Sequence, residues 1–532
     1  MRRRDISIFL FLFLPILCSA QGFLIRPSKL EFYLDSGKEQ IKEVEVFNQS
    51  QSSLLIKTEK SNFVANNDFS QSIILTKEDV PFSIFPYVEV FPEIFTLGPR
   101  EKKSLKIKVT LPSEIKEGSY YGALLFSIMP SLENQENSNN QIIARLGTLL
   151  FLKAGRSFFE NGFLEKFSLG KKIFTKPPLI FSFIFRNSGN VHLLPYGILE
   201  IFNWEGKKIK EIEIDPYFVL PNSVRERKII LNDPLPFGYY RAILSLNRGY
   251  KNLIDQKVIG FWVLPSSFFL ISLLIFFLVI IFFKRVKKFL GFAFFILFPF
   301  LVLAFEMQSA NYKVLESSLN IAGQDWQTSS QYILRENIGE FVAGQISSAV
   351  YKILLGYRGM PQTYLGLILS TTSVPLLPPF TLDQRIAQGN FEAKVITDNS
   401  TGYSLFVAAS STPALCFLDS CFSDYTPQTS GIPDFNWQIE ETQAEFGFTV
   451  EGEDIVQKFK DNSSQCNTGT QDTPDRCWLG FSINDQLVSY SPFPNQPNGK
   501  ITNFKLKAEI GSQKILPAGN YQAILFITAI AN

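Results

Sequence analysis

Alternating apolar and polar positions dominate the first part of the chain. Leu105, Ile107 and Val109 alternate with lysine and threonine residues, and this period of two is typical of a half-buried β-strand. Turn-forming Gly and Pro residues separate such runs. The pattern predicts an antiparallel, Ig-like β-sandwich over residues 21–155.

The same kind of pattern continues over residues 160–263 and predicts a second Ig-like sandwich. Its strand candidates are residues 179–186, 197–203, 209–214 and 242–246. A further β-sandwich-like domain is expected over residues 361–532, with strands at 391–397, 403–408, 446–450 and 521–530. The fold class is therefore all-β.

Residues 309–360 contain three similar Ser- and Tyr-rich segments. Tyr312, Tyr332 and Tyr351 each precede a short apolar run. Two interpretations stay open, a weak internal repeat or β-strands that merely share their composition.

Two apolar runs interrupt the β pattern near the middle of the chain. Residues 258–283 carry no charged side chain, which predicts a transmembrane helix at 264–283. The run 289–305 is also uncharged but contains Gly291 and Pro299. It is predicted to be either a second transmembrane helix or an internal signal-like segment.

Four cations separate these runs and set the expected topology: Lys284, Arg285, Lys287 and Lys288. Residues 284–288 are predicted to be a cytosolic turn of a transmembrane helical hairpin. Residues 1–20, with an Arg-rich start, an apolar core and a small-residue end, predict a secretory signal peptide. Both large folded regions would then lie outside the cytoplasm, held at the cell membrane. Alternatively, cleavage after Ala304 or Ala310 would give two chains.

The cysteines fit export. Four of the five lie in the last quarter of the chain, where an even number at short spacings predicts disulfides. Nearest-neighbour pairing would join Cys416 to Cys421 and Cys466 to Cys477. No metal site is expected, because these spacings are not those of zinc sites and His192 is the only histidine.

The N-terminal part, residues 1–288, resembles the WxL-interacting proteins of bacterial cell walls. The resemblance rests on KEGSYYG at residues 116–122, on NSGNVH at 187–192, and on the order signal, two sandwiches, span and basic tail. It implies a first domain that binds peptidoglycan and a second that contacts partner or host proteins.

The C-terminal part is similar to the WxL domain itself. Residues 395–405 resemble the segment that leads to its Gly-Trp-x-Leu motif, with Gly402 and Leu405 in place and Tyr403 where the motif has Trp. Residues 517–526 resemble its closing strand. Tyr403 and Leu405 alternate on an expected strand, which favours core packing for their side chains.

Three classes of function follow from the sequence. The favoured one is a non-enzymatic, membrane-anchored surface protein that binds cell-wall polymer (peptidoglycan or an anionic glycopolymer), other surface proteins and membrane lipid, with no cofactor. The alternative is a pilus-chaperone-like assembly module that works by β-strand addition. The most remote is a wall-active hydrolase with paired carboxylates, for which no spacing singles out a pair. No long single-sign charge run suggests nucleic acid.

Overall fold

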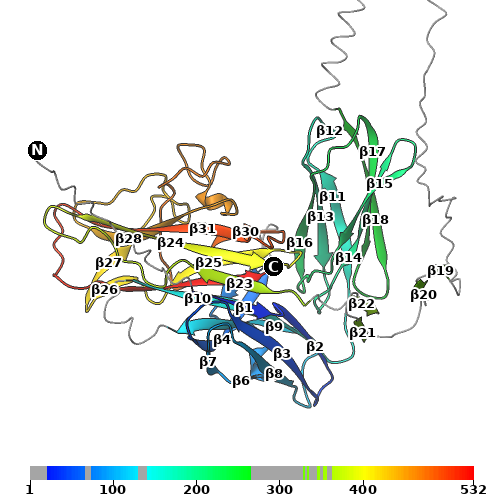
Figure 1. The fold of residues 1–532 in the computed structure, drawn as a ribbon, viewed down its shortest axis with the longest axis horizontal. Helices are drawn as coiled ribbons and strands as arrows, with labels where there is room; N and C mark the ends of the chain where they lie inside the picture. Colours follow the sequence, from blue (N-terminus) through cyan, green and yellow to red (C-terminus); the bar gives the residue numbers. More distant parts are fainter. Residues whose placement is uncertain are drawn as a thin grey trace, which may run out of the picture.

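A computed structural model gives the fold of the chain (Figure 1). It describes residues 21–65, 73–129, 140–264 and 362–532, together with the backbone of four short strands between residues 327 and 355. The described elements are β-strands joined by turns and short 3-10 segments. The prediction of an all-β, sandwich-forming chain is confirmed.

The strands expected from alternation are found nearly where the pattern put them. In the second sandwich they are β13 (Leu179–Asn187), β14 (Tyr196–Asn203), β15 (Lys208–Ile214) and β17 (Gly238–Asn247). In the C-terminal part they are β24 (Ile386–Thr397), β25 (Tyr403–Ala409), β28 (Ala444–Glu451) and β32 (Ala523–Ala531). The alternating run around Leu105 is β8 (Lys102–Thr110).

The predicted signal peptide, the apolar runs after Leu264 and the basic residues Lys284, Arg285, Lys287 and Lys288 lie outside the described residues. Within the part that the structure describes, no helix is long and apolar enough to cross a membrane. The hairpin therefore stays a prediction.

The first sandwich is built from ten strands. The remaining nine are β1 (Gln21–Arg26), β2 (Lys29–Leu34), β3 (Glu39–Asn48), β4 (Leu54–Ala65), β5 (Ile73–Thr76), β6 (Val88–Phe91), β7 (Ile94–Leu97), β9 (Gly118–Met129) and β10 (Asn140–Ala154).

The second sandwich packs a three-stranded sheet, in the order β11-β13-β16, on a five-stranded sheet, in the order β12-β18-β17-β14-β15. The strands not yet placed are β11 (Gly162–Leu169), β12 (Ile173–Phe174), β16 (Ser223–Leu231) and β18 (Ile254–Val263). Phe181, Phe183 and Phe185 are fully buried between the two sheets. Their spacing of two places all three on the same face of β13.

In the sequence, two small antiparallel ribbons come between the second sandwich and the C-terminal part. They are formed by β19 (Gln327–Ser329) with β20 (Tyr332–Leu334), and by β21 (Gly344–Ser347) with β22 (Lys352–Leu355). The C-terminal part continues with β23 (Leu365–Leu369), β26 (Leu415–Phe417), β27 (Ser420–Asp424), β29 (Leu479–Gly480), β30 (Gln486–Ser491) and β31 (Lys500–Ile510).

The two largest sheets each contain strands from both ends of the chain. One runs β26-β27-β28-β31-β24-β23-β1-β3-β8-β6, and the other runs β30-β25-β32-β10-β9-β4-β5. The first crosses between chain ends where β23 pairs antiparallel with β1, and the second where β32 pairs parallel with β10. We call these two pairings the seam, residues 21–264 the N-terminal half and residues 362–532 the C-terminal half.

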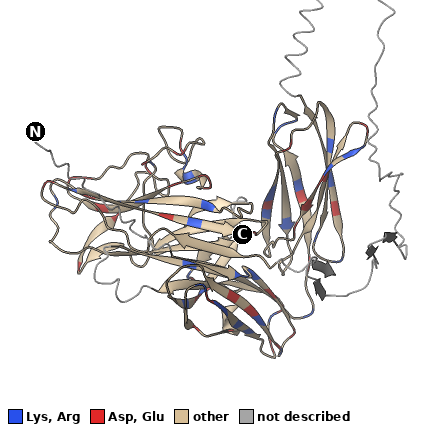
Figure 2. Cartoon of the chain, in the orientation of Figure 1, with Lys and Arg blue, Asp and Glu red and all other residues tan. Residues whose placement is uncertain are grey.

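A single hydrophobic core runs across the seam, from Phe23 and Phe32 in the N-terminal half to Phe446 and Phe504 in the C-terminal half. The strands in the middle of both sheets carry few charged residues (Figure 2), and β23, β25 and β32 carry none. Strands that are buried on both faces are expected to be continuously apolar. The two halves are thus one packed body and not separate arms.

Candidate functional site

Strand β10 pairs with strands of both halves. Residues 145–154 pair with β9 of the first sandwich, whereas residues 140–147 pair in parallel with β32. The first five residues of β10, 140–144, therefore extend beyond their own sandwich into the C-terminal half. There the main chain of Ile142 donates a hydrogen bond to Thr372 O, 2.9 Å away.

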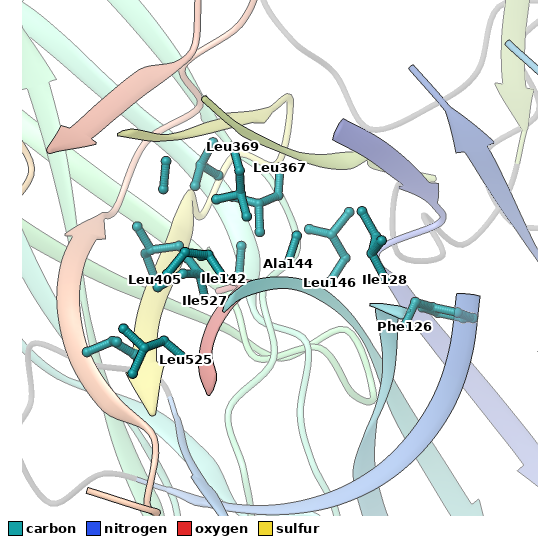
Figure 3. Packing of buried hydrophobic residues seen from close by; sticks show 14 of the residues in the cluster. Phe126, Ile128, Ile142, Ala144, Leu146, Leu367, Leu369, Leu405, Leu525 and Ile527 are labelled. Atoms are coloured by element: carbon teal, nitrogen blue, oxygen red, sulfur yellow. The ribbon is translucent and has the colours of Figure 1, made fainter. Parts of the chain in front are cut away.

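The apolar face of this extension fills the C-terminal core. Ile142, Ala144 and Leu146 are at most 2% exposed. Figure 3 shows them in the same core as Leu405, Leu525 and Ile527 of their own sheet and Leu367 and Leu369 of the other large sheet. Their spacing of two places all three on one face of the strand.

Asn140 anchors the start of β10 with its side-chain amide. Its Nδ2 donates to Val374 O at 3.0 Å, and its Oδ1 accepts from the main chain of Ala523 at 3.2 Å. The residue is fully buried, so both polar atoms need these partners. The register of β10 against β32 is fixed at its first residue.

Arg145 makes the only salt bridge across the seam among the described residues. Its Nη2 lies 2.6 Å from Asp485 Oδ1, and its Nε donates to Thr528 Oγ1 at 2.8 Å. The guanidinium also stacks 4.4 Å from the ring centroid of Phe526. Both charged side chains are about 6–7% exposed, so each would be an uncompensated buried charge without the other.

The second pairing of the seam, β1 with β23, brings the backbones close together. A Cβ on Gly22 would lie 2.6 Å from Ile368 Cγ1, so only glycine fits there without a shift. Beyond the strand, Ser28 Oγ and Thr363 Oγ1 are 2.6 Å apart in a buried hydrogen bond.

Lys29 lies where the first sandwich, the second sandwich and the C-terminal half meet. Its Nζ donates to Asn399 Oδ1 at 3.3 Å, to Thr401 Oγ1 at 3.2 Å and to the main-chain oxygen of Asn532. Burial, reinforced by the charges of two nearby arginines of the second sandwich, holds the pKa of Lys29 well below its usual value. The ammonium group is thus enclosed by acceptors of the C-terminal half.

Those two arginines connect the second sandwich to the same place. Arg227 Nη2 donates to Ser400 O at 3.2 Å, and Arg225 Nη1 donates to Phe218 O at 2.6 Å. The Phe218 ring lies 5.1 Å from Lys29 Nζ. One end of the second sandwich therefore contacts the C-terminal half beside the seam.

The only histidine takes part in a buried contact between the first two sandwiches. His192 Nδ1 lies 2.7 Å from Ser119 Oγ, and Nε2 lies 2.7 Å from Glu31 Oε1. Complete burial lowers the pKa of His192. All three side chains are at most 7% exposed, so this Ser-His-Glu set is a buried contact that joins the two sandwiches.

Both predicted disulfides are confirmed. Cys416 is bonded to Cys421 across the β26–β27 hairpin, and Cys466 is bonded to Cys477. Within the described ranges, no cluster of three or more His, Cys, Asp or Glu side chains could hold a metal ion.

The WxL-like motif residues lie beside the seam. Tyr403 and Leu405 are fully buried on β25, which pairs with β32, and the Tyr403 hydroxyl donates to Asp454 Oδ2 at 3.0 Å. Gly402 has a φ of +74° in the turn before β25. Packing in the core, the role expected for Tyr403 and Leu405, agrees with this placement.

Sequence reasoning missed the residues that bridge the halves, namely Lys29, Arg145 and Asp485. The segment 149–152 and the terminal strand at 523–531 are apolar, the latter except for Thr528, and such runs are the signal of strands buried on both faces. That signal could have marked β10 and β32 as central strands. Their mutual pairing has no local signature.

Comparison with known proteins finds similarity in fold only. Neither a protein-family model nor a curated protein sequence matches this chain. Among solved structures, the class 5 fimbriae chaperone CfaA is 16% identical, with an alignment that covers 46% of this chain and 100% of CfaA at a TM-score of 0.25.

Two further structures are similar at the same level. The CsuC-CsuE chaperone-tip adhesion subunit complex of Acinetobacter baumannii pili is 11% identical over 46% of this chain and 99% of that chain, at a TM-score of 0.23. A PapD-like domain of human CEP192 is 14% identical over 29% of this chain and 99% of that domain, at a TM-score of 0.19.

Proposed function

We propose that this protein is an assembly module that works by β-strand addition within one chain. The N-terminal half donates β1 and the start of β10, and the C-terminal half accepts them. The observation that carries the proposal is the position of residues 140–144, which pair with β32 and not with β9. Strand addition supplies affinity through main-chain hydrogen bonds and specificity through alternate side chains.

The C-terminal half needs the donated strands for a physical reason. Without β10, the edge of β32 would be open, and the core residues Leu525 and Ile527 would lose the cover of Ile142 and Ala144. An open, apolar and uncharged strand edge is prone to aggregation. The N-terminal half would thus act toward the C-terminal half as a folding partner.

Expression of the halves separately tests the proposal. Residues 362–532 alone should aggregate, and co-expression with residues 21–264 should give a soluble complex that survives size-exclusion chromatography. A folded, monomeric C-terminal half that does not bind the N-terminal half would contradict the proposal.

A matched pair of variants ties the result to β10. Ile142→Asp should abolish the complex, because it places a carboxylate in the C-terminal core while leaving the β9 pairing of the first sandwich untouched. Ile74→Asp, on the exposed side of β5, should leave the complex intact.

Binding of cell-wall polymer stays a prediction of the sequence resemblance. If purified wall material fails to pull down the whole protein, wall binding is refuted, and the proposal of strand addition is unaffected. Zymography on peptidoglycan tests the hydrolase alternative.

A further inference from the structure

One end of the second sandwich is remote from the seam and differs from it in chemistry. Here β12, the start of β17, the end of β18 and the β14–β15 turn come together, because Ile173 pairs with Trp262, Gly238 with Val263, and Asn203 with Tyr240. Figure 1 shows β12 at this end, away from the two large sheets.

Large apolar side chains are exposed at this end. Ile173 is 54% exposed, Trp204 71%, Phe237 49% and Trp262 45%. The Trp262 ring lies 5.3 Å from the ring of Tyr239. Single exposed apolar residues are ordinary, but a group with two tryptophans marks an interaction surface. Tryptophan is also enriched where one end of a side chain meets hydrocarbon and the other meets water.

Unpaired cations surround the apolar group. Four exposed lysines that form no salt bridge with a described residue belong to this end: Lys171, Lys172, Lys176 and Lys207. Of the two nearby carboxylates, Asp233 pairs with Lys210 at 2.5 Å, and Glu205 accepts from Asn203 Nδ2 at 3.2 Å. Figure 2 shows blue segments at this end of the sandwich. The surplus charge is positive and suits an anionic partner.

The chain itself indicates which anionic partner. The described part of the second sandwich ends at Leu264, whose main-chain N–H donates a hydrogen bond to Phe174 O of β12 at 2.7 Å. The sequence then continues with residues 265–283, none of which is charged. A run of this length and composition favours lipid.

We infer that this end of the second sandwich lies on an anionic lipid bilayer. Its aromatic side chains sit at the headgroup level and its lysines bind lipid phosphates, as polybasic segments do at anionic leaflets. We call Ile173, Trp204, Phe237 and Trp262, with Lys171, Lys172, Lys176 and Lys207, the basal patch. The inference does not depend on strand addition.

Hydrogen exchange of the full chain tests the inference. The protein is placed in nanodiscs of phosphatidylcholine alone and of phosphatidylcholine with phosphatidylglycerol. Peptides that cover residues 170–176, 204–207 and 232–237 should exchange at least about fivefold more slowly in the anionic nanodiscs, a factor that corresponds to the contact of one lysine with an anionic leaflet. The turn 248–253, at the opposite end of the sandwich, is the internal control and should not change.

A charge-removal variant makes the test specific. Changing the four lysines of the basal patch to glutamine should abolish the difference between the two lipids, while Lys102→Gln and Lys106→Gln in the first sandwich should not. Equal exchange in both lipids overturns the inference, as does failure of the chain to enter nanodiscs. Protection that also persists in detergent micelles would point to a protein partner and overturn it too.

Discussion

Among single residues, Arg145 is expected to have a large effect on the free energy of unfolding. Its guanidinium compensates the buried carboxylate of Asp485 across the seam. Arg145→Met should lower the free energy of unfolding by about 3–5 kcal/mol, because it leaves Asp485 buried without a counter-charge. Urea unfolding of the full chain measures the change.

A second substitution separates charge from shape. Arg145→Met with Asp485→Leu should recover at least half of the loss, since apolar side chains of similar volume often replace a buried ion pair at little cost. Arg186→Met breaks the exposed pair with Glu165 and should change stability little. An equal loss for both arginine variants would contradict a special role for Arg145.

Glu445 makes the stability of the C-terminal half depend on pH. Its Oε2 is buried without a hydrogen-bond partner, and burial raises the pKa of Glu445 to about 7. The folded state therefore holds this proton more tightly than the unfolded state does. The contribution of the protonated Glu445 carboxyl to the free energy of unfolding is fully present below the unfolded pKa of about 4.3. It is lost as the pH rises toward 7.

Glu445→Gln should remove this loss. The variant should match the native chain at pH 4 and exceed it at pH 8 by about 1–2 kcal/mol, after allowance for solvent screening. Thermal unfolding at the two pH values measures the gap. A gap that is the same at both would show that the Glu445 carboxyl does not titrate in this window.

At the scale of an element, the turn that starts β25 depends on Gly402. Its φ is +74°, and a Cβ there would lie 1.9 Å from the main-chain oxygen of Ser491. Gly402→Ala should therefore destabilise the chain by more than the about 1–3 kcal/mol that a positive φ alone costs. Gly206→Ala is the control, because Gly206 has a φ of +83° but open space around it. Equal losses in urea unfolding would mean that the contact with Ser491 can relax.

The elements themselves were largely predictable. Alternation located strands such as β13 and β25 to within one residue, because side-chain period and burial are local properties of the sequence. Short cysteine spacing likewise located both disulfides. The pairing of β10 with β32 was not predictable, since Asn140 and Ala523 are 383 residues apart and neither strand carries a sequence signal that identifies its partner.

At the scale of the whole molecule, the halves should stay together when the chain between them is cut. The seam contacts are all made by residues 21–264 and 362–532. A protease site inserted at residues 317–322 should give two bands on a denaturing gel but one peak on size exclusion. Elution as two peaks would mean that the seam is too weak to hold without the covalent connection.

The parallel pairing of β10 with β32 also determines how the protein responds to dilution. The paired strands belong to one polypeptide, so their pairing is intramolecular, and its effective concentration does not depend on how many molecules are present. Each molecule would then complete its own sheets however few copies a cell makes. Once the connection is cut, the same contacts obey mass action, and separated strands become available to other copies.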